Sequence, residues 1–160
     1  MADAISNTSP LLYLHRAGAL DWLGALFGDV WVPRGVVEEL RAGRELGHDV
    51  PLVPSQPWLR VVNARHTPSA WLALDLGPGE LGAMALALEN PDRIVLLDDA
   101  LARRTAVAAG LRVWGTLRVL LEAKTRGLTP RIEPLLDRLA NAGMWFSADL
   151  RRRVLSLAGE

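Results

Sequence analysis

The stretch Ile94-Val95-Leu96-Leu97, followed at once by Asp98-Asp99, decides the fold class of this chain. An uninterrupted apolar run of this length predicts a strand buried on both faces, which is typical of the interior of a parallel sheet. Helices cover both faces of such a sheet, so short strands and helices should alternate along the chain. We therefore predict an α/β domain with a short, mostly parallel central sheet flanked by helices, and we place residues 94–97 at its centre.

The remainder of the chain fits this alternation. Other strands are predicted at residues 4–6, 30–32, 58–62 and 111–114. Helices are predicted at residues 10–18, 20–28, 34–42, 80–89, 100–109, 117–126, 131–141 and 148–157. We expect Ser9 to cap the first helix with Pro10 at its first position. Gly77-Pro78-Gly79 should form a turn, and residues 43–57, rich in glycine and proline, a mobile connection.

Length and composition describe one domain, which we place at residues 1–160. A chain of 160 residues has room for a single core. The 18 acidic residues balance 18 basic ones, which argues against binding nucleic acid by bulk charge. The absence of cysteine excludes disulfides, thiolate zinc sites and cysteine nucleophiles. His15, His48 and His66 lack the spacing of a Ser-His-Asp or zinc site.

Two further compositional features concern location and the aromatic residues. Met1-Ala2-Asp3 is acidic where a signal peptide is basic, and no apolar run approaches the roughly 18 residues of a membrane span. The sequence thus predicts a cytoplasmic protein with no membrane partner. The tryptophans lie mostly in apolar runs and are predicted to belong to the core or to an interface. They are Trp22, Trp31, Trp58, Trp71, Trp114 and Trp145.

Polar side chains gather where the predicted strands end. Asn7-Thr8-Ser9 follows the first strand, Asp98-Asp99 the fourth and Gly115-Thr116 the fifth. Ligands of open parallel sheets bind beyond the carboxyl ends of the strands. Glu39 and Glu80 lie on helices that feed the same edge. Carboxylate, amide and hydroxyl oxygens in one place favour a hard divalent cation.

Each acid also has a purely structural explanation. Glu80 at the start of a helix interacts favourably with the helix dipole. Glu39 on a helix surface can simply be solvated. Arg103, one turn after Asp99, can offset the charge of that residue as an i,i+4 ion pair.

The order and spacing of these motifs resemble the PIN domain family and, within it, the VapC-like subgroup. The resemblance runs from about residue 4 to residue 160. The motifs that carry it are Ile5-Ser6-Asn7-Thr8-Ser9-Pro10-Leu11-Leu12, Val32-Pro33, Glu39-Leu40, Gly79-Glu80, Leu97-Asp98-Asp99 with Ala102-Arg103, and Gly115-Thr116-Leu117. The family fold implied is a three-layer sandwich around the parallel sheet.

The resemblance implies a metal-dependent endoribonuclease, typically the toxin of a toxin–antitoxin pair, in which Mg²⁺ or Mn²⁺ activates water to hydrolyse RNA. The implied catalytic acids are Glu39, Glu80, Asp98 and Asp99, and the implied metal ligands are these acids with Asn7. Sequence does not separate Asp98 from Asp99 as the last acid. Hydroxyls of Thr8, Ser9 and Thr116 would hydrogen-bond the acids or the waters of the metal.

The family generally carries aspartate at the first acid position, where this chain has Asn7, which leaves a second function class open. That class is a PIN-fold module with weak or no catalysis that docks an antitoxin or RNA. A phosphate-accepting receiver domain is disfavoured, because its acid pair would follow the first strand. The expected partners are RNA, an antitoxin protein and a second copy of the chain. We expect a cationic rim to hold RNA, formed by Arg103, Arg104, Arg118, Lys124 and Arg126.

Overall fold

A sheet of five parallel strands forms the centre of the computed structural model, which describes residues 2–53, 55–66 and 76–160. The strands are β1 (Ala4–Ser6), β2 (Val30–Val32), β3 (Leu59–Val61), β4 (Ile94–Leu96) and β5 (Val113–Trp114). Their order across the sheet is β3-β2-β1-β4-β5, and every neighbouring pair is parallel. The predicted α/β class with a parallel sheet is confirmed.

The central strand is β1, so the placement of residues 94–97 at the centre of the sheet was wrong. β4 lies one position away from the centre, paired with β1 on one side and β5 on the other. All residues of both β1 and β4 are buried. An apolar run indicates only that a strand is buried on both faces. Because β1 and β4 are both interior strands, such a run cannot show which of them is central.

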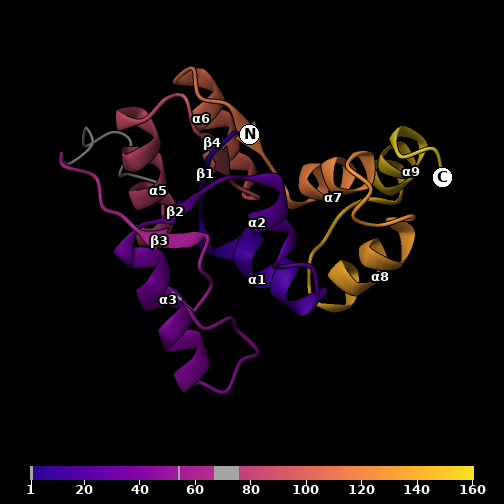
Figure 1. Cartoon of the computed structure of the whole chain (residues 1–160), viewed down its shortest axis with the longest axis horizontal. Coiled ribbons are helices and arrows are strands. Elements are labelled where there is room, and N and C mark those ends of the chain that lie inside the picture. Colours follow the sequence, from indigo (N-terminus) through magenta and orange to yellow (C-terminus); the bar gives the residue numbers. More distant parts are fainter. Residues whose placement is uncertain (1, 54, 67–75) are drawn as a thin grey trace.

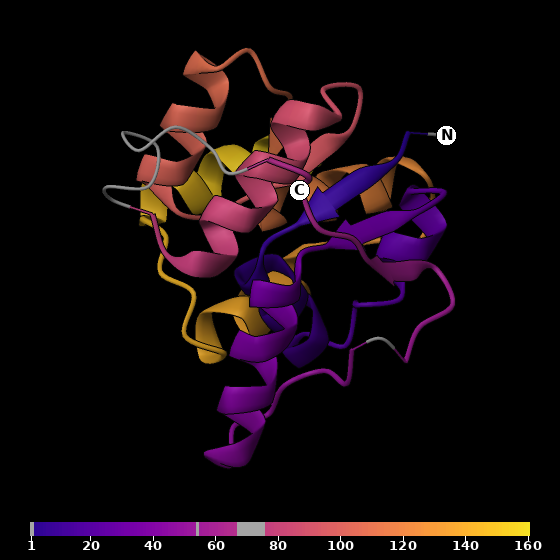
Figure 2. The ribbon, with the colours of Figure 1, turned by 90° about the vertical axis from the view of Figure 1, so that its left-hand side faces the viewer.

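Helices cover both faces of the sheet and complete three layers (Figures 1 and 2). The helices are α1 (Thr8–Arg16), α2 (Trp22–Leu26), α3 (Arg34–Glu45), α5 (Pro78–Glu89), α6 (Ala100–Ala108), α7 (Thr116–Thr125), α8 (Glu133–Asn141) and α9 (Ala148–Leu157). Ile5 and Val95 pack in one apolar cluster with residues of α5 and α6. Ala4 and Leu96 pack in the other with residues of the remaining helices. Alternate strand residues therefore serve opposite layers.

The starts of α1 and α5 and the end of α3 differ most informatively from those predicted. α1 begins at Thr8 with Asn7 as its N-cap, so Pro10 is the third helical residue and Ser9 is not the cap. Proline is tolerated there because the first N–H groups of a helix have no intrahelical partner. Pro78 is the first residue of α5, so the predicted turn is a helix start. α3 continues to Glu45 and shortens the predicted connection.

The tryptophans contribute little to the deep core. Trp145 is 85% exposed, in the segment between α8 and α9. Trp22, Trp31, Trp58 and Trp114 are half-buried against the apolar clusters, and Trp71 lies outside the described residues. Within the described ranges, no helix is long and apolar enough to cross a membrane.

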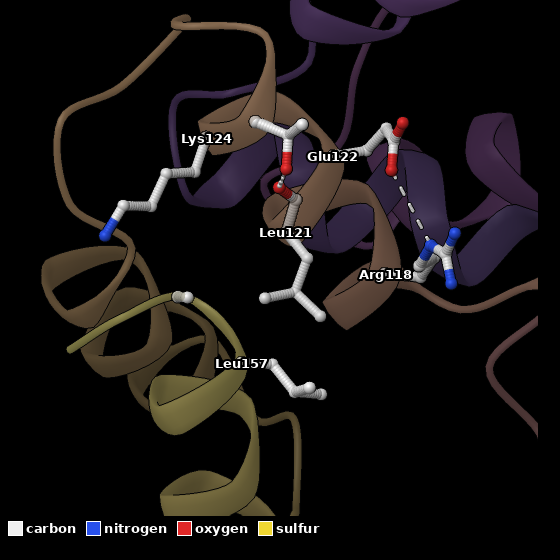
Figure 3. Close-up of a pocket in the computed structure, with 7 residues that line it drawn as sticks. Arg118, Leu121, Glu122, Lys124 and Leu157 are labelled. Carbon is white, nitrogen blue, oxygen red and sulfur yellow. Dashed lines mark hydrogen bonds and ion pairs between the residues drawn. The ribbon is translucent and has the colours of Figure 1, made fainter.

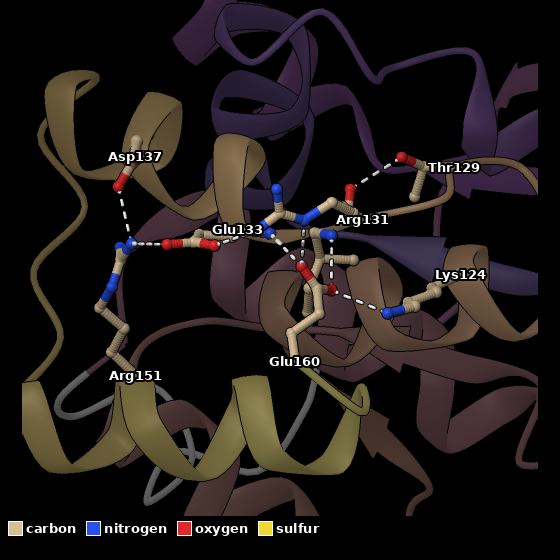
Figure 4. Close-up of polar contacts among 8 residues, drawn as sticks. Lys124, Thr129, Arg131, Glu133, Asp137, Arg151 and Glu160 are labelled. Atoms are coloured by element: carbon tan, nitrogen blue, oxygen red, sulfur yellow. Dashed lines mark hydrogen bonds and ion pairs between the residues drawn. The ribbon is translucent and has the colours of Figure 1, made fainter.

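Glu160 ties the segment after α9 to the starts and ends of neighbouring helices (Figure 4). Its carboxylate accepts hydrogen bonds from the Lys124 ammonium at 3.0 Å and the Ile132 N–H at 2.8 Å. The Arg131 guanidinium lies 3.4 Å away, and the side chain is only 8% exposed. Burial works to raise the pKa of Glu160, but the hydrogen bonds from Ile132, Lys124 and Glu133 outweigh it and lower the pKa to about 2.

Replacing Glu160 by glutamine should lower the free energy of unfolding by about 1 kcal/mol at neutral pH. A carboxyl group whose pKa is depressed by folding stabilises above its unfolded pKa, and the contribution is lost as pH falls through the folded value. The difference between wild type and variant should therefore shrink as pH falls from 4.5 towards about 2. Urea unfolding across this range measures it. Glu38→Gln, at an exposed position of α3, is the control; an equal loss there would remove Glu160 from this role.

Candidate active site

Four helices begin at one edge of the sheet, because α1, α3, α6 and α7 each follow the carboxyl end of a strand. The N–H of Asn7 donates to the carbonyl of Leu96 at 3.1 Å, so β1 and β4 end side by side. Asn7, Asp98-Asp99 and Gly115-Thr116 occupy the joints after β1, β4 and β5. The predicted polar edge therefore exists, built from segments far apart in the sequence.

Glu39 joins its own helix, α3, to the starts of α1 and α5. One oxygen of its carboxylate accepts a hydrogen bond from the Thr8 hydroxyl at the start of α1, at 2.5 Å. The other accepts one from the N–H of Gly79 in the first turn of α5, at 2.9 Å. Although Glu39 is exposed as a whole residue, its head group is held at both oxygens.

Glycines let α3 and α5 approach closely enough for these contacts. A Cβ on Gly79 would lie 2.7 Å from a carboxylate oxygen of Glu39, and one on Gly82 would lie 3.0 Å from the Cβ of Pro33. A Cβ on Gly35 would lie 3.3 Å from the carbonyl oxygen of Pro78. Gly79 is thus a site residue whose role the sequence did not reveal: the sequence places it in a turn and in the Gly79-Glu80 motif, but predicts no contact for it. The signal in the sequence that could have revealed this contact was the spacing of small residues along α3 and α5.

The pKa of Glu80 responds to its burial and to the charges of the other acids. Burial raises the pKa of Glu80 most, and the charges of Asp99 and Glu39 raise it further, against a hydrogen bond from the Gly77 N–H. That bond is 3.2 Å long and caps α5. Carboxylates from α3, α5 and the β4–α6 joint are therefore crowded enough to act on one another.

Asn7 carries a buried oxygen that has no hydrogen-bond partner among the described residues. The residue is 4% exposed, and its Oδ1 accepts no hydrogen bond from any described residue. Such an orphaned group typically costs about 1–3 kcal/mol, and native structures contain few of them. The amide oxygen is thus available to an external donor or cation.

Asp98 and Asp99 have different surroundings. Asp99 caps α6 by accepting the Ala102 N–H at 2.9 Å. Both oxygens of Asp98 are bonded to Thr116, one to its N–H at 2.7 Å and one to its hydroxyl at 2.6 Å. Burial raises the pKa of Asp98, while these bonds and the charge of Arg103 oppose the rise. No ion pair joins Asp99 to Arg103 in the described part of the chain, so that structural alternative does not apply.

The remaining predicted residues do not form one continuous group. Ser9 donates no hydrogen bond to the described acids. Arg103 and Arg104 belong to the first half of α6 and Arg118 to the first turn of α7, whereas Lys124 is in the last turn of α7 and Arg126 follows it. Arg126 donates to the Leu26 carbonyl at 3.4 Å.

Arg118 and Lys124 are also engaged elsewhere. Arg118 pairs with Glu122 at 3.7 Å, beside a pocket between α7 and α9 that Leu121 and Leu157 also line (Figure 3). Lys124 lines the same pocket and pairs with Glu160. The structure thus separates Lys124 and Arg126 from the acids by most of the length of α7.

A family model described as DUF3368, a PIN domain, matches residues 3–160. The chain belongs to the PIN domain family. PIN domains are in general nucleases, hydrolases of phosphodiester bonds, and they generally use divalent metals. Comparisons with curated proteins and with solved structures give no match.

The residues of this PIN domain fit a divalent cation. The Oδ1 of Asn7, which has no described partner, and the carboxylates of Glu39, Glu80 and Asp99 are oxygen donors. A cation would offset both the burial of Glu80 and the charges of Asp99 and Glu39, which together raise the pKa of Glu80. Within the ranges that the structure describes, no three acids or histidines converge tightly enough to enclose an ion. Mg²⁺ keeps several of its waters and is usually bound through one or two carboxylates, so a loose arrangement suits it.

Proposed function

We propose that this PIN domain is an endoribonuclease that depends on Mg²⁺ or Mn²⁺ held by Asn7, Glu39, Glu80 and Asp99. The observation that carries the proposal is the buried Oδ1 of Asn7, which has no hydrogen-bond partner among the described residues and which a cation would satisfy. The carboxylates from three separate elements support it, because the charges of Asp99 and Glu39 both act on Glu80. Oxygen donors of this kind match the preferences of both ions.

The residues around the acids have distinct tasks in this proposal. A bound divalent ion supplies an activated water and neutralises charge that builds up on the phosphodiester. The Thr8 hydroxyl and the Gly79 N–H keep the Glu39 carboxylate from turning into solvent. The Gly77 and Ala102 N–H groups orient Glu80 and Asp99 in the same way. Pre-oriented ligands reduce the entropy lost on binding the ion.

Metal binding and cleavage, measured separately, test the proposal. Titration with Mn²⁺, followed by electron paramagnetic resonance, should show binding to the wild-type protein. Cleavage of a mixed single-stranded RNA should require Mg²⁺ or Mn²⁺ and stop in EDTA. Cleavage that persists in EDTA, or no Mn²⁺ binding at millimolar concentration, contradicts the proposal. RNA binding without Mn²⁺ binding would favour the module that has lost catalysis, for which the neutral Asn7 is the supporting observation.

We further propose that the nuclease is a toxin whose partner is an antitoxin protein. The support is the VapC-like order of motifs in a chain whose PIN membership is established over residues 3–160. Induced expression should arrest bacterial growth, and Glu80→Gln should relieve the arrest at equal protein level. An adjacent gene for a short DNA-binding protein should neutralise the wild type when it is co-expressed. If the active nuclease did not affect growth, the protein would be an enzyme but not a toxin.

RNA binding should depend moderately on salt. Arg103, Arg104 and Arg118 lie near the helix starts at the acid edge, whereas about ten residues of α7, or about 15 Å, separate Lys124 and Arg126 from it. Roughly three phosphate contacts predict a log-log salt slope of about 2 for a single strand. The slope, measured by fluorescence anisotropy in EDTA, should fall in Arg104→Ala and stay constant in Arg126→Ala. The reverse pattern would move the RNA path to the far end of α7.

A further inference from the structure

We propose that Asp98 is a positioning residue and not a metal ligand: through Thr116 it fixes the start of α7, and it keeps the Arg103 guanidinium beside Gly115, where the guanidinium binds an RNA phosphate. This inference rests on the proposed ribonuclease function for the identity of the substrate. It separates two neighbouring acids that the sequence leaves equivalent. We name this cluster the α7 latch; it consists of Asp98, Arg103, Gly115 and Thr116.

The hydrogen bonds of the Asp98 side chain join it to the first turn of α7. Thr116 is fully buried and occupies both carboxylate oxygens, with its N–H at 2.7 Å and its hydroxyl at 2.6 Å. Two bonds from one residue fix the plane of the carboxylate against the first turn of α7. Of the two neighbouring aspartates, Asp99 is the one whose charge acts on Glu80. The Asp98 carboxylate is therefore bound to the β5–α7 joint, whereas the Asp99 carboxylate caps α6 and acts on Glu80.

Gly115 shows where the Arg103 guanidinium lies. A Cβ on Gly115 would lie 3.0 Å from Nη1 of Arg103 and 3.2 Å from an oxygen of Asp98. The backbone of Gly115 has φ −94° and ψ 175°, which any residue can adopt, so the space for these two side chains is what glycine provides. The guanidinium and the carboxylate thus flank the same Cα at the start of α7.

The side-chain donors of Arg103 have no partner in the part of the chain that the structure describes. In the described part of the chain, the Arg103 guanidinium donates no hydrogen bond and has no ion pair within 4.0 Å. Its charge nevertheless lowers the pKa of Asp98, against the rise caused by burial. Asp98 can therefore hold the guanidinium in place electrostatically without occupying its donors. An arginine fork with free donors suits the bidentate binding of a phosphate.

The latch adjoins the proposed metal site through the backbone of α6. The Arg103 N–H donates to the carbonyl of Asp99 at 2.9 Å, so the two residues are one helical turn apart. An RNA phosphate on Arg103 would lie next to a phosphodiester held at Asp99. The latch thus aligns the strand, whereas Asn7, Glu39, Glu80 and Asp99 carry the ion.

Two binding measurements separate these roles. In EDTA, Arg103→Gln, Gly115→Ala and Thr116→Val should each weaken binding of a short fluorescein-labelled single-stranded RNA by about three- to tenfold. Thr116→Ser keeps the hydroxyl and should bind as the wild type does. By Mn²⁺ titration, Asp98→Asn should stay within about twofold of wild type, whereas Asp99→Asn should lose at least about tenfold in affinity. In steady-state cleavage, Thr116→Val should raise KM more than it lowers kcat.

The outcomes that overturn the inference are distinct from those that overturn the ribonuclease proposal. Loss of Mn²⁺ affinity in Asp98→Asn equal to that in Asp99→Asn would make Asp98 a ligand. Unchanged RNA binding in Arg103→Gln, or failure of Thr116→Ser to restore binding lost in Thr116→Val, would dismiss the latch. If the wild type neither binds Mn²⁺ nor cuts RNA, the ribonuclease proposal fails, and the RNA-binding arms still decide the role of Arg103. Thermal unfolding of each variant verifies that it is folded.

Discussion

RNA cleavage should fall by about a hundredfold or more when Glu80 is replaced by glutamine or Asp99 by asparagine, because each change removes a ligand charge from the proposed ion. Neither change should destabilise the apo-protein. Glutamine can still accept the Gly77 N–H, and asparagine remains a good cap for the Ala102 N–H. Loss of one of several crowded like charges should leave the free energy of unfolding equal or higher.

The pH dependence of stability gives a second readout for Glu80. Burial first, and then the charges of Asp99 and Glu39, raise the pKa of Glu80 above 4.5. A carboxyl group with a raised pKa stabilises the fold fully below its unfolded pKa, and this contribution is lost as pH rises through the folded value. The apo wild type should therefore lose stability as pH rises above 4.5, and Glu80→Gln should lose less.

Cleavage rate and urea unfolding, measured on the same preparations, decide this prediction. Glu38→Gln changes an exposed carboxylate on α3 and should leave both quantities near the wild-type values. Survival of cleavage in both Glu80→Gln and Asp99→Asn would show that the acid edge is not the active site. Loss of cleavage together with unfolding would show instead that these acids serve the fold.

Changing Asn7 to aspartate should have opposite effects on the apo and metal-bound protein. Asn7 is 4% exposed, and its Oδ1 has no described hydrogen-bond partner. A carboxylate there should bind Mg²⁺ about tenfold more tightly, equivalent to about 1.4 kcal/mol, because neighbouring acids and solvent absorb much of the added attraction. Without metal, the new charge joins Glu39, Glu80 and Asp99, and the free energy of unfolding should fall.

Calorimetric Mg²⁺ titration tests the predicted gain in affinity. Thermal unfolding with and without the ion tests the predicted loss of apo stability. Asn141→Asp, at an exposed position in α8, adds the same charge away from the edge and should leave Mg²⁺ affinity unchanged. Equal affinity and equal apo stability in Asn7→Asp and wild type would remove Asn7 from the site. An unchanged affinity with lower apo stability would assign the residue to the fold alone.

The sheet edge could be predicted from sequence because its determinants are local. The run at residues 94–97 predicts a buried parallel strand, and polar residues directly after such a strand must lie at its carboxyl end. That reasoning places Asn7, Asp98-Asp99 and Thr116 at the edge, where the structure also has them. The start of α5 was missed because Gly77-Pro78-Gly79 contains the residues of a turn and equally those of a helix entry.

Other parts of the site depend on contacts between distant segments. Which of Asp98 and Asp99 turns towards Thr116 depends on how β5 and α7 lie against β4, and neighbouring residues in a chain carry no signal for it. The separation of Lys124 and Arg126 from the acids depends on the direction of α7. The contact between Glu39 and Gly79 forms because α3 and α5 pack so closely that only glycine fits between them. The sequence pattern of one helix alone does not reveal such packing.

The packing at Gly79 gives this position a constraint of its own. It lies within α5, where the backbone would accept any ordinary residue, and yet the smallest side chain would displace the head group of Glu39. Intolerance to substitution on this edge should therefore extend to a residue that has no side chain and no reactive atom. In a saturation screen scored by survival, Gly79 would be indistinguishable from the acids, and a search for ionisable groups alone would overlook it.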